Sequence, residues 1–131
     1  MSAEDAYESA LREGYREEAR HYAEALQLAG LITAALRQGT GAEEPLARLQ
    51  AVFARVAAVE ARLAALPRPA LRGEGSGTEE AKAEVIALIE RVVAEIREGE
   101  REAVARRDAL VLPLEMGIRA RRMQRAYGQG R

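Results

Sequence analysis

The sequence contains no cysteine, no tryptophan and no asparagine, and only one histidine among its 131 residues. Without cysteine, neither a disulfide framework nor a thiolate metal site can form. The single histidine, His21, follows Glu18 at the Glu-x-x-His spacing of helical di-iron proteins, but such a centre needs a second copy of the motif and further carboxylates. We therefore expect no metal and no cofactor.

Catalytic motifs are missing as well. The glycine-rich run 73–78 precedes a predicted helix, as a phosphate-binding loop does, but it lacks a preceding strand and the lysine that reaches the outer phosphates. Ser9, Thr33 and Ser76 have no histidine partner in the pattern of the chain, so no nucleophile and base are paired. We predict that the protein is not an enzyme.

Long hydrophobic runs are also absent. No apolar stretch approaches the roughly 18 residues that a membrane-spanning helix requires. The first twenty residues carry six acidic side chains, whereas a secretory signal starts with basic residues and continues with an apolar core. We expect a cytoplasmic protein without stable membrane insertion.

Helix-forming residues fill the remaining composition. Ala, Glu, Lys, Leu and Arg account for 81 of 131 residues, and apolar residues recur at steps of three and four. This pattern predicts an all-α fold in a single domain, 1–131: an elongated three-helix antiparallel bundle or coiled-coil hairpin with a long, Pro-kinked C-terminal helix. The expected helices span about 3–38, 43–66, 78–112 and 114–127, with a flexible linker at 67–77.

Each predicted helix has an apolar stripe. The stripe of the first helix comprises Leu11, Tyr15, Tyr22, Leu26, Ala29, Ile32 and Leu36; that of the second comprises Leu46, Leu49, Val52, Phe53, Val56, Val59, Leu63 and Leu66; that of the third comprises Val85, Ile89, Val92, Ile96, Gly99, Ala103 and Leu110.

Local signals mark the ends and weak points of these helices. Gly39 and Gly41 end the first helix, and Thr40 with Glu43 predicts a capping box for the second. Small or charged residues interrupt the apolar stripe of the third helix, so we expect this helix to bend or stand clear of its neighbours between 98 and 107. Pro113 removes a backbone hydrogen bond and predicts a kink.

The charge distribution differs between the two ends of the chain, although the net charge is only −1. Residues 116–131 contain five arginines, Arg119, Arg121, Arg122, Arg125 and Arg131, and no acid. Such a tail could contact phosphates, but arginines near a helix C-terminus also offset the negative end of the helix dipole. We expect no binding to nucleic acid.

The segment 109–118 is apolar around most of the helix circumference, whereas the other helices are apolar along one stripe. A helix of this kind needs burial from several sides. Contacts within a bundle or a dimer could provide that burial; alternatively, the segment is a docking surface for helical partners, where adaptable methionines suit more than one partner. We predict that partners bind to Leu110, Leu112, Leu114, Met116, Ile118, Met123 and Tyr127.

The helix order, the stretches 22–39 and 83–96, and the closing Arg-Met-Gln-Arg-Ala-Tyr-Gly of 122–128 together resemble the flagellar type III export chaperones of the FlgN/FliT type. The resemblance spans nearly the full chain. It implies a small cytoplasmic bacterial protein without ATPase activity that holds late export substrates before secretion. In that family the substrates are hook-filament junction proteins or the filament cap protein, held by their C-terminal helical segments.

Members of that family bind largely through the C-terminal helix, which corresponds here to Leu110–Tyr127. The resemblance thus implies that a flagellar export substrate is the partner of the apolar segment. The competing hypothesis is a structural coiled-coil or adaptor protein that only self-associates, because an incomplete three-helix core with heptad spacing is also typical of a homodimer.

Overall fold

Three helices make up the part of the chain that the structure describes. The computed structural model describes the backbone of residues 2–67 and 76–129, and the side chains of residues 2–67 and 77–107. The helices are α1 (Ala3–Gln38), α2 (Glu43–Ala64) and α3 (Ser76–Gln129), and these ranges contain no strand. The prediction of an all-α chain with helices packed against one another is confirmed. None of the described helical stretches combines the length and apolarity needed to cross a membrane.

Residues at both ends of α1 explain its bounds. The Ser2 hydroxyl accepts a hydrogen bond from the Asp5 amide at 3.1 Å, which caps the first turn. Gly39 ends the helix in the left-handed region at φ 72°, and the Thr40 amide then donates to the Ala35 carbonyl at 2.9 Å.

The capping box predicted for α2 is wrong. The N-cap of α2 is Ala42, whose side chain makes no capping hydrogen bond. The Thr40 hydroxyl instead donates to the Ala35 carbonyl at 3.3 Å, so it closes the end of α1. A Thr followed by Glu three residues later can cap the start of the next helix or the end of the preceding one. Here the Thr40 hydroxyl donates to a carbonyl in the last turn of the preceding helix.

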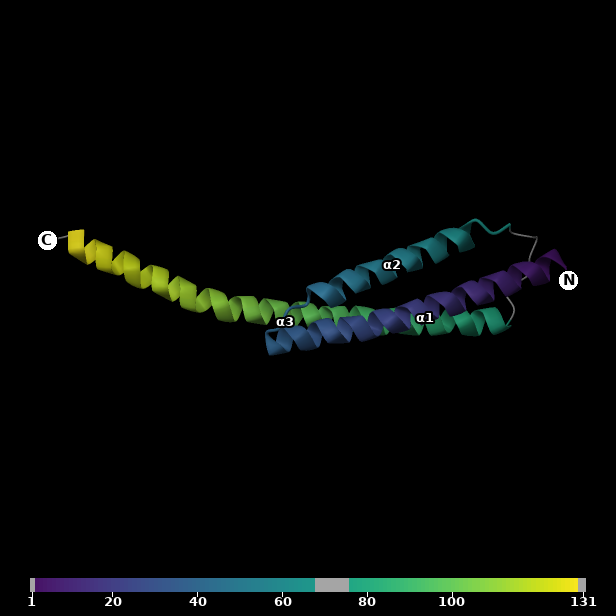
Figure 1. The fold of residues 1–131 in the computed structure, drawn as a ribbon, viewed down its shortest axis with the longest axis horizontal. Helices are drawn as coiled ribbons and strands as arrows, with labels where there is room; N and C mark the ends of the chain where they lie inside the picture. The colour runs from purple at the N-terminus through teal and green to yellow at the C-terminus, as the bar shows by residue number, and fades with distance from the viewer. Residues whose placement is uncertain (1, 68–75, 130–131) are drawn as a thin grey trace.

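The central element is α1, which packs against both other helices, whereas among the described residues no Cα atom of α2 lies within 8 Å of one in α3. Figure 1 shows that α2 runs back along α1 and that α3 then runs in the direction of α1. At the α1–α2 contact, Glu17 pairs with Arg62, and Glu24 pairs with Arg55 at 3.1 Å. The result is an elongated molecule with one open side between α2 and α3.

The core forms where side chains of all three helices meet over α1. Ala25 and Leu28 of α1, Leu49 and Val52 of α2, and Val92 of α3 form one buried cluster. The partly buried Tyr22, Leu26, Ile32 and Ile96, all from the predicted stripes, pack against it. Because α1 is covered from two sides, its buried surface is wider than the predicted stripe and includes Gly14, Glu18, Ala19, Ala25, Leu28 and Thr33.

The middle of α3 packs closely against α1. The expectation that the helix stands clear of its neighbours between 98 and 107 is therefore wrong, whereas a bend there stays a prediction. Gly99 is buried, and a Cβ atom at this position would lie 3.1 Å from the Thr33 hydroxyl oxygen. The small residue that thins the apolar stripe therefore permits close approach of the two backbones. Arg106, also on that stripe, donates to the Arg37 carbonyl at the C-terminal end of α1.

The long helix α3 is a single element of 54 residues, Ser76–Gln129. The sequence divided this region into 78–112 and 114–127, but the structure has one helix that passes through Pro113. A bend at Pro113 stays a prediction. At 1.5 Å per residue the helix is roughly 81 Å long, far beyond a compact domain of this size.

Candidate protein-interaction site

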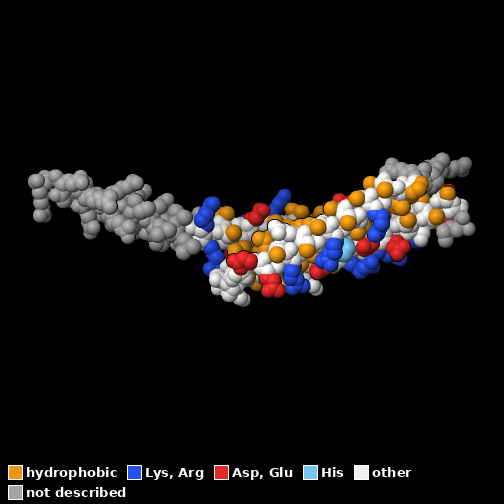
Figure 2. All heavy atoms as spheres, turned by 45° about the horizontal axis from the view of Figure 1, so that its top comes forward, with side chains coloured by type: hydrophobic (Ala, Val, Ile, Leu, Met, Phe, Trp, Pro, Cys, Tyr) orange, Lys and Arg blue, Asp and Glu red, His pale blue; other side chains and the backbone are white. Residues whose placement is uncertain are grey.

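An apolar trough lies between α2 and α3, with α1 as its floor. The helices on its two sides carry large hydrophobic side chains that stay accessible: Leu46 and Phe53 of α2 are 46% and 37% exposed, and Ile86 and Val93 of α3 are 48% and 40% exposed. A step of seven residues separates Leu46 from Phe53 and Ile86 from Val93, so each pair lies on one side of its helix, next to the buried stripe. Figure 2 shows hydrophobic side chains along much of one face of the molecule. The trough resembles the vacant position of a fourth helix.

One end of the trough deepens into a groove of about 240 Å³. Its lining comes from all three helices: Ala29, Ile32, Thr33, Leu36, Leu46, Leu49, Glu95, Ile96, Gly99, Glu100 and Ala103. Glu95 and Glu100 are the charged members of this set, and neither forms an ion pair with another described residue. This apolar groove with two carboxylates is therefore suited to an apolar helix that carries basic residues.

The opposite end of the trough is more polar. A cavity of about 400 Å³ there is lined by Tyr7, Leu11, Tyr15, Glu18, Glu60, Leu63, Ala64 and Lys82. Glu18 is only 5% exposed, and burial, together with the nearby charge of Glu60, raises the pKa of its carboxyl group. The same two causes, with Glu18 itself, raise the pKa of the Tyr22 hydroxyl.

The Glu18 and His21 pair of the sequence does not form a ligand set within the described residues. Glu18 is buried, whereas the Nε2 atom of His21 lies 3.8 Å from a carboxylate oxygen of Glu17, four residues earlier on α1. No group of three or more His, Cys, Asp or Glu side chains in the described ranges is placed to hold a metal ion.

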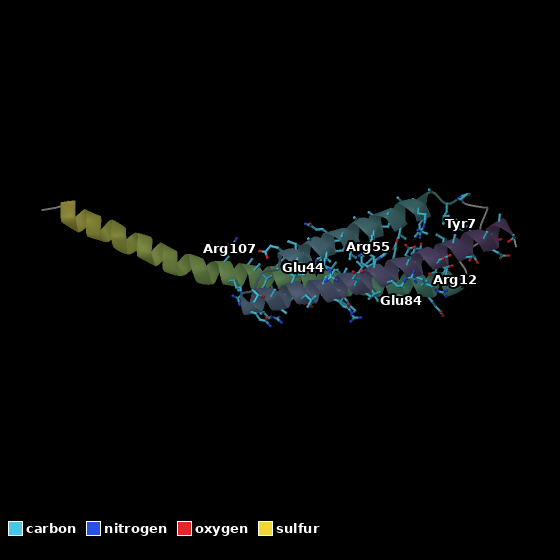
Figure 3. The ribbon with its side chains drawn as sticks, viewed as in Figure 1. Tyr7, Arg12, Glu44, Arg55, Glu84 and Arg107 are labelled. Carbon is cyan, nitrogen blue, oxygen red and sulfur yellow. The ribbon has the colours of Figure 1, made fainter. Side chains whose placement is uncertain are left out.

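Ion pairs tie α3 to the end of α1 just before α3 leaves the other helices. Arg37 contacts Glu98 at 2.9 Å and Glu102 at 3.0 Å, and these hydrogen bonds raise the pKa of the guanidinium group. The Arg106 guanidinium lies over the Gly39 turn, and its Nε atom is buried without a hydrogen-bond partner in the described region. Figure 3 places Arg107 close to this exit point.

Beyond this point α3 continues past the ends of α1 and α2 (Figure 1). We call residues 107–129 the extension; it is roughly 34 Å long. All seven predicted partner-binding residues, Leu110, Leu112, Leu114, Met116, Ile118, Met123 and Tyr127, belong to it. Their side chains lie outside the described ones, so this site stays a prediction.

The trough is the surface that sequence reasoning missed. Leu46 and Phe53 belonged to the predicted core stripe of α2, and Ile86 and Val93 lie one position from the predicted stripe of α3. The sequence did contain a signal for this surface, because a helix with two adjacent apolar stripes needs two neighbouring helices to bury them. Comparison of the chain with protein-family models, with curated proteins and with solved structures finds no match in any of the three.

Proposed function

We propose that the protein is a non-enzymatic cytoplasmic chaperone for late flagellar export substrates, either hook-filament junction proteins or the filament cap protein. It binds the C-terminal helical segment of its client and hides apolar surface without changing the client chemically. The resemblance of the sequence to the FlgN/FliT type supports the choice of client class.

The observation that carries the binding role is the open trough of the three-helix part. Four large hydrophobic side chains of the helices on its two sides, Leu46, Phe53, Ile86 and Val93, are each more than one third exposed. A helix laid against the accessible face of α3 would bury them, and apolar burial contributes about 25 cal/mol per Å² before ordering costs. The same helix, α3, continues into the predicted site at 110–127.

The proposal includes an antiparallel hairpin with a bend at Pro113, which sets the direction of the extension relative to the trough. An amphipathic client helix packs along α3 and reaches from the trough onto Leu112 and Met116. Apolar contacts provide the affinity, and the carboxylates of Glu95 and Glu100 favour clients with basic residues beside the apolar face.

Isothermal titration with C-terminal segments of the junction and cap proteins from the same genome tests this function. We expect saturable binding of one segment at micromolar or lower Kd, and loss of that binding in Leu112→Asp and Met116→Asp with helicity unchanged by circular dichroism. Leu31→Asp is the matched control, because Leu31 is 55% exposed and does not line the groove. Binding retained in both extension variants would place the client elsewhere.

The second candidate is a structural coiled-coil or adaptor protein that only self-associates. It is favoured by the extension, since α1 and α2 end before that part of α3 begins (Figure 1). Absence of heat with every client segment, despite an intact helical fold, would support this candidate over the chaperone.

A further inference from the structure

We propose that two copies of this chain associate through an antiparallel pairing of their α3 helices, with the extension of each copy reaching the groove of the other. The two-fold axis lies beside Leu112. This inference does not rest on the proposed function, because it concerns the protein without a client.

We place the axis at Leu112 because the described helix of each copy then reaches the groove of the other. An axis at Leu112 pairs residues that are equally distant from it along α3, so Gln129, the last residue of the helix, lies beside Glu95. Glu95 is also the first α3 residue of the groove, whose α3 wall runs from Glu95 to Ala103. The helices then overlap over 95–129, a length of about five heptads.

Charge favours the antiparallel direction. Residues 95–102 contain four glutamates and two arginines, whereas residues 116–131 contain five arginines and no acid. The axis at Leu112 places the Arg-rich 119–125 of one copy beside 99–105 of the other, next to this acidic stretch. In a parallel pair the arginines of the two copies would face one another instead, and like charges at such positions repel.

The groove provides the apolar part of the contact. Its walls include Leu46, Ile96 and Ala103, and its two carboxylates, Glu95 and Glu100, have no ion-pair partner among the described residues. An incoming helix with arginines can cover the apolar walls and pair with these carboxylates. Because the interface is isologous, each such contact forms twice.

Disulfide trapping tests the geometry, and the absence of cysteine makes each introduced thiol the single one in its chain. At an antiparallel axis a residue meets its own copy, so Leu112→Cys should oxidise to a covalent dimer. Gln124→Cys should not dimerise with itself, but should cross-link to Glu100→Cys in a mixture of the two variants, because both positions lie twelve residues from Leu112.

Charge reversal tests the role of the Arg-rich end by sedimentation equilibrium. Arg121→Glu with Arg125→Glu should raise the dimer Kd about tenfold, since two exposed pairs are lost in each half of the interface. Adding Glu95→Arg and Glu100→Arg to the same chain should restore association. Arg16→Glu with Arg20→Glu is the control: it makes the same charge change at exposed positions of α1 and should leave the Kd unchanged.

Two results would overturn the inference. One is a monomer mass in sedimentation equilibrium at about 100 µM protein, a concentration well above the Kd that we expect for this dimer. The other is self-linking of Gln124→Cys as fast as that of Leu112→Cys, which would indicate a parallel pair. Neither result depends on a client, so failure here and failure of the chaperone proposal are separate findings.

Discussion

The two halves of α3 belong to one helix but differ in what surrounds them. Up to Arg106, α3 packs on α1 through Val85, Val92 and the close contact of Gly99 with Thr33. Beyond that point it runs past the ends of α1 and α2 (Figure 1). The border lies at the Gly39 turn, where α1 ends. Helix length and the extent of burial are thus decided by different parts of the sequence.

The largest expected effect comes from a charge placed in the core of the three-helix part. Val52 is fully buried, so Val52→Asp places a carboxylate without a partner in the core and should lower the free energy of unfolding by about 3 kcal/mol or more. The control Val104→Asp, at a valine that is 46% exposed, should change it by less than about 0.5 kcal/mol. Thermal unfolding by circular dichroism measures both, and equal losses would contradict the assigned core.

A glycine pair tests the close contact between α1 and α3. Gly99→Val should cost about 1–3 kcal/mol, because Thr33, only 1% exposed and bonded to the Ala29 carbonyl at 3.1 Å, cannot move away. Gly30→Ala should instead stabilise by about 1 kcal/mol, since nothing lies within 4 Å of the added methyl group. Chemical denaturation gives both values. A stabilising Gly99→Val would mean that the helices are further apart.

Glu18 should make the stability of the three-helix part depend on pH. Its folded-state pKa is raised above the ordinary 4.5, so the stability it contributes is present below pH 4.5 and is lost as the pH rises through the raised pKa. Glu18→Gln cannot ionise, and its Tm at pH 7 should exceed that of the wild type by about 2 °C. The difference should vanish near pH 4. Glu13→Gln, at an exposed position of α1, is the control for the loss of one carboxylate from the same helix.

The smallest expected effect concerns the ion pairs at the end of α1, where the packed part of α3 meets the extension. Arg37→Ala removes the contacts with Glu98 and Glu102, which are solvent-exposed, so the Tm should fall only slightly. Amide hydrogen exchange should increase locally around 98–106 and stay unchanged around Val92. Exchange that rises along the whole of α3 would indicate that the two halves unfold as one unit.

Much of the fold could be predicted from local chemistry. Ser2 and Gly39 delimit α1, and the spacing of Leu49, Val52, Val56 and Val59 identifies the buried face of α2. The sequence could not show that α1 is central, because a stripe on each helix does not specify how many neighbours it has. The wider buried surface of α1 and the exposure of Leu46 and Phe53 follow from that arrangement.

The sequence did not show the roles of Gly99 and Arg106 either. Both interrupt the apolar stripe of α3 and therefore indicated a weak contact. In the structure Gly99 allows the closest approach to α1, and Arg106 donates to a carbonyl that the end of α1 leaves without a helical partner. Only the position of α1 beside them explains these residues, since each acts on a segment about sixty to seventy residues earlier in the chain.

The length of α3 also governs how the molecule diffuses. A rod of roughly 81 Å on a chain of 14.3 kDa experiences more friction than a sphere of the same mass. A monomer should therefore leave a gel-filtration column early, at the volume of a larger globular protein. Light scattering, which reports mass independently of friction, separates an elongated monomer from a true dimer.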